Sequence, residues 1–386
     1  MNIKRNLSIV VAASLVSTAS YGAAVVPDGR GNGMGNAGVT SADYVLAPFY
    51  NPALVAVYRD SDSFGVLFPA IGIRVRDTDE SLATIDDLQD TIKAFENGGS
   101  GDQTTVDQLN SYLTRLADDK PLAVNGGVGV SVALPIDTIS SNFFARGYAE
   151  VIASTKIAAD GGNSASAVQS RYENSSVDVI AFGLEEYGVA LAKIFVLSGQ
   201  QVSIGVTPKL QQMRTYNQNL SVEDFDIDDY DQTEKKKNAF NIDLGAVWVA
   251  DQFRAGIAIK DLFSQRIDTL AVNNTMYRYE LDTQVTVSGS YTSTYFTATA
   301  DLDLTEQGRF VNVNDDTQFL RFGIEGNAAG WAQLRAGYEI DIEDTLDNSV
   351  TAGIGISPGD LVSFDVAGSY AGDNQFGVSA NLAFTF

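Results

Sequence analysis

Apolar and polar residues alternate along most of the chain with a period of two, the spacing of a β-strand that has one apolar face. The last segment is the clearest case, because every second residue from Phe376 to Phe386 is apolar and the residues between them are small or polar. An even number of such strands is typical of a closed antiparallel barrel with both chain ends on one side. The alternation predicts fourteen strands, at 61–76, 122–135, 141–158, 175–196, 200–216, 237–250, 252–262, 276–288, 291–304, 317–327, 331–341, 348–357, 361–371 and 374–386.

The connections between these strands alternate between short and long. Short connections are predicted at 197–199, 251, 289–290, 328–330 and 357–360, and long ones at 78–121, 159–174, 217–236, 263–275 and 305–316. A water-soluble β-sandwich is the alternative fold, but it has no reason to sort its loops by length, whereas outer-membrane barrels do so. We therefore predict an all-β fold over 59–386, a transmembrane antiparallel up-and-down β-barrel of about 14 strands.

The N-terminal segment predicts export. Lys4 and Arg5 precede an apolar run at 7–16 and a run of small residues at 17–24, which is the three-part pattern of a secretory signal peptide. We expect residues 1–24 to be removed, with an N-terminal membrane anchor as the alternative. No later stretch has the roughly 18 apolar residues of a transmembrane helix. These features predict a protein of the Gram-negative outer membrane with both termini periplasmic, which contacts outer-membrane lipid and the barrel-assembly machinery.

Two of the predicted loops carry patterns of their own. Within 77–121, apolar residues spaced three or four apart at 80–96 and 104–117 predict a helical hairpin in the first outer loop. The apolar seams of the two helices either pack on each other or bind a partner. The segment 223–231 is rich in Asp, but it lacks the glycine and the final glutamate of a calcium loop, so we interpret it as solvated and predict no metal site.

Charged residues recur at positions that should face the barrel interior. The predicted lumen residues are Arg146, Glu150, Glu185, Glu186, Lys209, Arg321, Glu325, Arg335 and Asp365. Both signs occur, so neighbouring strands can neutralise each other's charges. The set is either a salt-bridged lumen or the lining of a translocation path. Glu185 and Glu186 interrupt an apolar strand, and a β-bulge there would explain the break and could open a window in the wall.

Composition narrows the range of functions. The chain has 25 basic and 49 acidic residues, a formal charge of −24, and neither Cys nor His. Without these two residue types it can hold no disulfide, no thiolate or histidine metal ligand and no Ser-His-Asp triad, so we expect no enzyme and no cofactor. The acidic balance also argues against direct binding of nucleic acid.

Residues near the N-terminus resemble a known family. A run of small residues at 31–38 is followed by the sequences Ser-Ala-Asp-Tyr and Tyr-Asn-Pro-Ala, which contain the plug-motif residues Asp43, Asn51, Pro52 and Ala53. This arrangement resembles the N-terminal hatch of the FadL-like superfamily of long-chain fatty-acid transporters. The resemblance implies that residues 25–58 form a plug inside a fourteen-stranded barrel.

Further motifs are similar to the TraF-type conjugal transfer family within that superfamily. They are Glu-Tyr-Gly-Val-Ala-Leu-Ala-Lys at 186–193 and Gly-Val-Thr-Pro-Lys-Leu at 205–210. The last strand, with Phe384 and Phe386, resembles the signal that the barrel-assembly machinery recognises. The resemblance implies a non-enzymatic outer-membrane barrel that is a component of a plasmid- or DNA-transfer apparatus, with conjugation-apparatus proteins as partners. The alternative is a FadL-like transporter of hydrophobic small molecules, either fatty acids or aromatic compounds.

Overall fold

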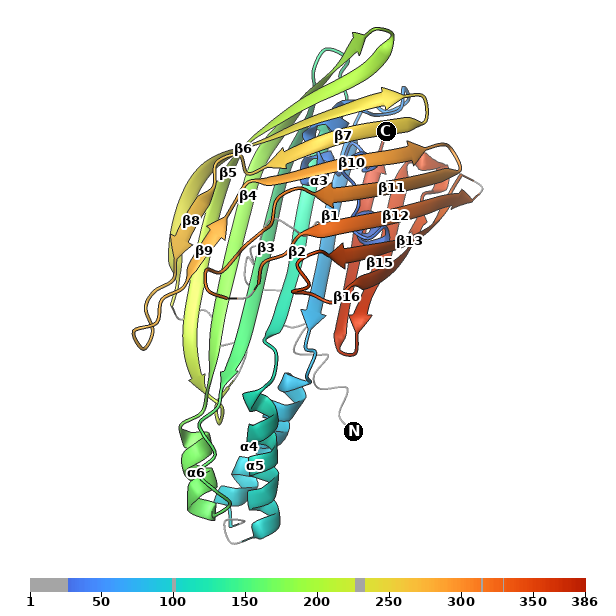
Figure 1. Cartoon of the computed structure of the whole chain (residues 1–386). Coiled ribbons are helices and arrows are strands. Elements are labelled where there is room, and N and C mark those ends of the chain that lie inside the picture. The colour runs from blue at the N-terminus through green and yellow to red at the C-terminus, as the bar shows by residue number, and fades with distance from the viewer. Residues whose placement is uncertain (1–26, 99–101, 226–232, 314, 329) are drawn as a thin grey trace.

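Fourteen antiparallel strands close into a barrel (Figure 1). The computed structural model describes residues 27–98, 102–225, 233–313, 315–328 and 330–386. The predicted signal peptide and most of the acidic loop lie outside the described residues. The last barrel strand pairs with the first, so the sheet has no free edge. The predicted fold class is therefore confirmed.

The barrel strands present an apolar face outward and a polar face inward. On the last strand, Phe376 and Val378 are exposed on the outer face, whereas Ser379 and Asn381 are buried inside. The strands are β1 (Gly65–Arg76), β2 (Leu122–Leu134), β3 (Ser140–Lys156), β4 (Ser176–Leu197), β5 (Gln200–Ser221), β6 (Lys235–Ala250), β7 (Phe253–Lys260), β10 (Gln284–Thr292), β11 (Phe296–Asp303), β12 (Phe319–Ala328), β13 (Ala332–Asp341), β14 (Ser349–Ile356), β15 (Val362–Gly372) and β16 (Gln375–Thr385).

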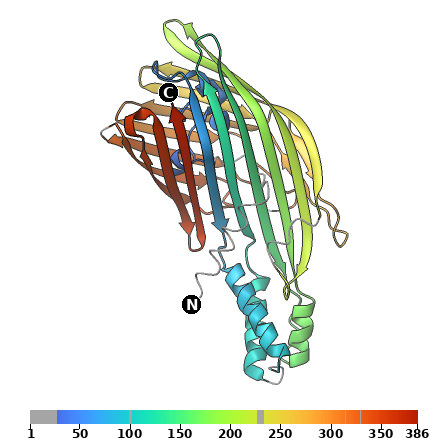
Figure 2. The same cartoon turned by 180° about the vertical axis from the view of Figure 1, so that it is seen from behind.

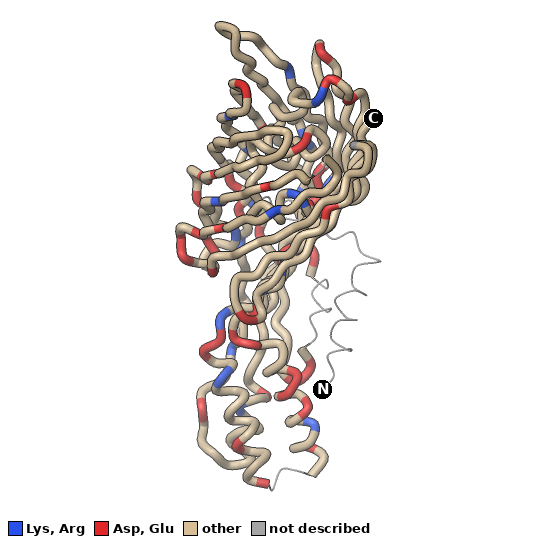
Figure 3. Tube along the Cα trace, turned by 90° about the vertical axis from the view of Figure 1, so that its right-hand side faces the viewer, with Lys and Arg blue, Asp and Glu red and all other residues tan. Residues whose placement is uncertain are grey.

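The two ends of the barrel differ in the length of their connections. At the end that carries the C-terminus, which we call the C-terminal end, the longest connections are 135–139 and 357–361, the latter with the 3₁₀ helix η4 (Pro358–Asp360). The opposite end, which we call the hairpin end, carries α4 (Ser81–Glu96), α5 (Gln103–Ala117) and α6 (Ala165–Glu173) (Figure 2). Acidic residues gather on these helices, whereas the tilted strands of the wall are mostly uncharged (Figure 3).

The helices at the hairpin end pack against the outer face of the long strands β2 to β5. Val177 and Val179 of β4 contact the helical bundle, whereas Ile180 on the opposite face belongs to a cluster inside the barrel. The seams of α4 and α5 meet at Leu88 and Leu109, both fully buried. Their apolar residues therefore pack on each other and on the wall. None of the helices in the described part of the chain is long and apolar enough to cross a membrane.

The predicted strand at 276–288 is wrong, because this region forms two separate strands. β9 (Arg278–Leu281) pairs with β8 (Gln265–Asp268) in a small sheet of its own, and β10 begins after the break. β10 continues through 289–290, where we predicted a turn, since both residues pair with β7 and β11. Alternation continues across the break, so the sequence pattern alone could not reveal it.

Residues 27–58 lie inside the barrel, where we call them the plug. Its first helix, α2 (Gly29–Gly33), lies along β13 to β16, and α3 (Ala47–Tyr50) and η1 (Pro52–Ala56) lie near β3 to β6. On the β3–β6 side, an apolar cluster joins the plug to small wall residues such as Ala190 and Ala192. The plug thus contacts opposite sides of the lumen.

Candidate functional site in the barrel lumen

Asn51 begins the helix η1 and attaches the plug to the wall. Its side-chain oxygen accepts a hydrogen bond from the Ala53 amide (3.0 Å), as an N-cap residue does. Pro52 occupies the first helical position, where no amide donor is needed. The Asn51 side-chain amide donates to the carbonyls of Val39 in the plug (3.0 Å) and Ile257 in β7 (3.3 Å). The Asn-Pro-Ala motif therefore has a local folding role and an anchoring role.

The motifs that carry the family resemblance meet in space. Gly205 of β5 lies against the backbone of Pro52 and Ala53, so closely that a Cβ at this position would come within 2.4 Å of the Ala53 nitrogen. Only glycine allows this approach. Lys209, in the same motif as Gly205, reaches into the lumen and pairs with Glu186 of the other motif (2.9 Å). The plug, β4 and β5 therefore meet at one place.

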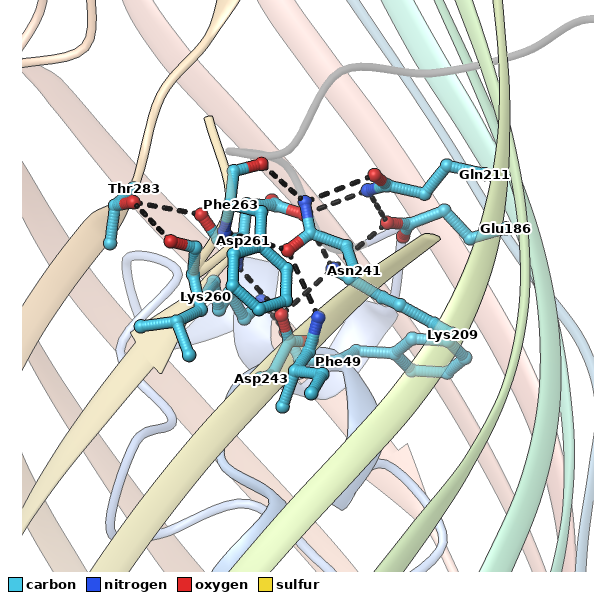
Figure 4. Close-up of polar contacts among 12 residues, drawn as sticks. Phe49, Glu186, Lys209, Gln211, Asn241, Asp243, Lys260, Asp261, Phe263 and Thr283 are labelled. Carbon is cyan, nitrogen blue, oxygen red and sulfur yellow. Dashed lines mark hydrogen bonds and ion pairs between the residues drawn. The ribbon is translucent and has the colours of Figure 1, made fainter. Parts of the chain in front are cut away.

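Lys209 is the centre of a buried charged cluster (Figure 4). Its ammonium nitrogen lies 2.8 to 2.9 Å from three carboxylates, those of Glu186, Asp243 and Asp261. Three buried carboxylates around one cation would repel one another, but Arg146 pairs with Glu186 and supplies a second positive charge. Every partner in the cluster therefore depends on the others for neutralisation.

A lysine next to the charged cluster contacts the plug. Lys260, at the end of β7, donates a hydrogen bond to the carbonyl of Phe49 in α3. Gln211 connects two carboxylates of the cluster, since its side-chain amide lies 2.7 Å from both Glu186 and Asp261. Lys260 directly precedes Asp261 in the chain, and Asp261 pairs with Lys209, so a shift of α3 would act on the residue next to the cluster.

A second ionic network holds the other side of the plug. Arg30 of α2 forms a two-pronged pair with Glu325 of β12, with both nitrogen–oxygen distances at 3.0 Å. Arg335 lies 2.6 Å from Glu325 and 2.6 Å from Asp365. Asn381 of β16 accepts a hydrogen bond from the Gly29 amide (2.7 Å). The first helix of the plug is thus held by charges on the wall.

Peptide groups of the plug also bind polar side chains of the wall. The Asp301 carboxylate accepts hydrogen bonds from the amides of Gly38 (2.8 Å) and Val39 (3.0 Å). The Ser203 hydroxyl donates to the carbonyl of Ala53 (2.6 Å). The Thr40 and Ser288 hydroxyl oxygens lie 2.7 Å apart. Much of the contact between plug and wall is therefore polar.

Two connections fold inward and narrow the lumen at the hairpin end. Tyr279 of β9 stacks on Phe182 of β4, with ring centroids 3.5 Å apart, and Phe310 in the connection 304–318 packs edge-on against Tyr279. Asp315 accepts a hydrogen bond from the Phe310 amide (2.9 Å). Burial raises the pKa of the Asp315 carboxyl to about 6, although the nearby Arg309 guanidinium opposes this rise.

A cavity of about 360 Å³ lies between these loops and the plug. Its lining includes Arg74 and Arg76 of β1 and Asn36 of the plug. It also includes Arg309 of the connection 304–318, which we call the inward loop. A smaller cavity of about 40 Å³ lies deeper, against the plug. Asn36 and Arg321 line both cavities, so the two spaces are neighbours along the lumen.

The structure places the sequence-predicted residues as follows. The side chains on the lumen side are those of Arg146, Glu150, Glu186, Lys209, Arg321, Glu325, Arg335 and Asp365, all of them in the ion pairs of the wall and plug. The Asp43 carboxylate accepts a hydrogen bond from the Val45 amide (3.2 Å). Phe386 is exposed at the C-terminal end and its ring lies near Phe64. Phe384 is half-buried.

Glu185 differs from the sequence-based expectation, because it lies on the outer face of β4. It pairs with Arg214 (2.7 Å) and shares this face with the exposed residue Tyr187. The predicted bulge is also absent from the register of β4 with β3 and β5 at this point, which is regular. Adjacent residues of a regular strand point to opposite faces, so Glu185 and Glu186 cannot both face the lumen. The register of β1 shifts instead, between Leu67 and Ala70.

The sequence analysis missed several lumen residues. Arg74 and Arg76 alternate with the apolar residues Ile73 and Val75, so the period-two pattern could have identified them. The role of Asp301 had no such signal, because it depends on where the plug lies.

Two solved structures that share this architecture are a transporter and a channel. The toluene transporter TodX of Pseudomonas putida superimposes with a TM-score of 0.52 and 11% identity, over 96% of this chain and 99% of that one. The monoaromatic hydrocarbon channel CymD superimposes with a TM-score of 0.55 and 11% identity, over 93% and 97%. At this identity the likeness shows the fold alone. The class of protein is thus a plugged fourteen-stranded barrel of the kind seen in these channels.

Residues 48–303 match the family described as "F plasmid transfer operon, TraF, protein". The chain belongs to this family, which confirms the resemblance found in its motifs. No curated protein sequence matches the chain.

Proposed function

We propose that this protein is a plugged channel of the outer membrane, which admits a small molecule at the hairpin end and releases it at the C-terminal end when the plug shifts. The observation that carries the proposal is the polar attachment of the plug beside a cavity. A hydrogen bond between plug and wall can be exchanged for one with water at a net difference of only about 0.5–1.5 kcal/mol. A plug held in this way can move without unfolding the barrel.

The outer face of the wall supports placement in a membrane. On β5 the exposed residues Ile204 and Leu210 lie within an outward-facing apolar run from Val202 to Leu210. At a rise of about 3.4 Å per residue and a tilt of about 40°, this run spans about 21 Å, close to the roughly 25 Å apolar belt of outer-membrane barrels. Beyond it on the same face lies the polar pair of Glu185 and Arg214.

The comparison with outer-membrane barrels also supports an orientation of the barrel across the membrane. Such barrels place short turns in the periplasm and long loops outside. We therefore assign the C-terminal end to the periplasm and the hairpin end to the exterior. The solute would then meet the cavity of about 360 Å³ before it meets the plug.

A reversible lock on the plug tests the proposal. The native chain contains no cysteine, and the Thr40 and Ser288 hydroxyl oxygens lie 2.7 Å apart, so the double variant T40C/S288C brings two sulfurs within bonding reach. In planar bilayers and in arabinose-driven swelling of proteoliposomes, we expect oxidation to reduce permeation at least tenfold and a reductant to restore it. The single variants T40C and S288C are the matched controls. Equal permeation in the oxidised and reduced double variant would refute plug movement.

The family's description supports a second proposal, that the protein acts in a conjugal transfer apparatus. The helical bundle projects beyond the barrel at the hairpin end, where an external partner could reach it (Figure 2). Asp87 and Asp90 lie on its exposed face, so the charge-reversal variant D87K/D90K should reduce plasmid transfer and leave channel conductance unchanged. Unaltered transfer, both in this variant and after deletion of the gene, would argue against this role.

A further inference from the structure

Two arginine side chains in the larger lumen cavity have buried nitrogen atoms without a hydrogen-bond acceptor. They are Nη2 of Arg74 and Nε of Arg76, and both residues line the cavity of about 360 Å³. Arg76 is only 8% exposed, and it has no hydrogen bond or ion pair to any described residue. Burying a cation without a partner costs free energy, and a bound anion would offset this cost at Arg76.

The carboxylates near Arg76 are already engaged. Glu339 accepts hydrogen bonds from Arg74 (3.0 Å) and from Asn36 (3.0 Å), and it also pairs with Arg321 (3.4 Å). Asp341 accepts hydrogen bonds from the backbone amides of Gln318 and Leu346.

The inward loop adds a further positive charge. Arg309 faces the same cavity and is paired with Glu150 (2.8 Å). The charged groups that act most strongly on Arg76 are two cations, Arg74 and Arg309, and two anions that other donors already hold, Glu339 and Asp341. The cavity therefore has donor nitrogens without an acceptor on Arg74 and Arg76. Of its other carboxylates, those of Glu150, Asp315 and Asp347 accept hydrogen bonds from other groups, and that of Asp344 is exposed.

We propose that this cavity binds a small carboxylate, held by Arg76 and Arg74. The planar guanidinium group matches the two oxygens of a carboxylate, which explains arginine in preference to lysine at this position. Ile152, Val313 and Phe319 line the same cavity and offer an apolar surface to the body of the ligand. A volume of about 360 Å³ lies at the lower end of the range for ligand sites, so the ligand is compact and has no long tail.

A carboxylate site rests on the proposed channel function and specifies its solute as an anion, in contrast to an uncharged hydrocarbon. Passage of the carboxylate rests on the proposed plug movement, but its binding does not. Entry is selective under this proposal because the acidic chain repels free anions in general. The arginine pair offsets this repulsion within the cavity.

Equilibrium binding to the full-length barrel in detergent tests the site. Isothermal titration would use benzoate as the probe, benzamide as its uncharged analogue and inorganic phosphate as a second anion. We expect benzoate to bind at least tenfold more tightly than benzamide. Equal binding of benzoate and benzamide, or binding of phosphate without binding of benzoate, would overturn the assignment of a carboxylate site.

The variant R76Q keeps a polar side chain, shorter than that of arginine, and removes its charge. We expect it to weaken benzoate binding at least tenfold, R76K to weaken it less, and the surface variant K236Q to leave it unchanged. Heat-modifiable migration on a gel confirms that each variant is folded. We also expect R76Q to resist thermal unfolding at least as well as the native barrel, because it removes an unpaired buried cation. Unchanged benzoate affinity in folded R76Q would overturn the proposal.

The two proposals fail separately. If benzoate binds but the T40C/S288C lock does not alter conductance, the carboxylate site stands and the plugged channel is wrong. If the lock alters conductance but benzoate does not bind, the channel stands and the carboxylate site is wrong.

Discussion

The plug and the helical bundle are both compact additions to the barrel, but they are attached by different physical means. The bundle packs through fully buried leucines such as Leu88, Leu109 and Leu113, which join α4 and α5 to the outer wall. The plug is attached on one side by an apolar cluster and on the other by ion pairs and hydrogen bonds, for example that of Arg30 with Glu325.

The difference in attachment makes the helical bundle a permanent support and the plug a movable part. Exposing a buried leucine costs about 1.5–3 kcal/mol, and water offers no compensation. Water does compensate for most of a lost hydrogen bond, so polar contacts can open at lower cost. The bundle therefore stabilises the long strands, whereas the plug can leave part of its site.

The largest loss of stability is expected in the charged cluster around Lys209. Replacing Lys209 by Met leaves three carboxylates near one another, with Arg146 and the neighbouring Lys260 as the remaining counter-charges, and should destabilise the barrel by about 3–5 kcal/mol. Urea unfolding followed by tryptophan fluorescence measures the change. Lys236→Met removes the same charge from a half-exposed position and should cost little. Similar stability of the two variants would show that the cluster is unimportant.

A smaller loss is expected in the bundle. Leu113→Ala removes a fully buried side chain and should reduce the local stability of α5 by about 2–5 kcal/mol. Hydrogen exchange of the α5 amides measures this loss, and the exposed variant Gln108→Ala is the control. Channel conductance should stay unchanged. If conductance rose as much as it does on loosening the plug, the distinction between support and movable part would fail.

Loosening the plug at a single polar residue should have a milder effect. Asn51→Ala removes a helix cap, which alone accounts for about 0.5–2 kcal/mol, and the two hydrogen bonds donated by the Asn51 side-chain amide. Open events in single-channel recordings should become more frequent, while the global unfolding transition barely moves. Unchanged opening would indicate that η1 stays docked during conduction.

The smallest effect concerns the inward loop that carries Asp315. Because burial raises the pKa of this carboxyl to about 6, the folded loop binds a proton more tightly than the unfolded one. The contribution is fully present below the unfolded pKa of about 3.9 and is lost as pH rises through about 6. Lowering the pH from 7 to 6 should stabilise the docked loop by about 0.4 kcal/mol, or about twofold in hydrogen-exchange protection. Asp315→Asn should abolish this dependence, and its persistence in that variant would assign it to another group.

Local patterns predicted much of the wall but not the details that depend on neighbours. The alternation along 374–386 identified β16 because each residue's face is set by its own strand. Alternation failed at 276–288, where Tyr279 and Leu281 keep the period of a wall strand but are buried against the aromatic cluster inside the barrel. It also allowed a bulge at Glu185 that the paired register excludes.

The order of apolar and polar residues by itself determined the closed sheet, the sorting of its loops and the helices of the hairpin, since these follow from spacing within short segments. Tertiary structure decided that Lys209, Glu186 and Asp261 share one cluster and that Gly205 receives the backbone of the plug. It also decided that the Nε atom of Arg76 has no hydrogen-bond partner among the residues that the structure describes. The reason is geometric: ion pairs and close backbone contacts depend on the register between strands and on the path of the plug, which bring together residues far apart in the sequence.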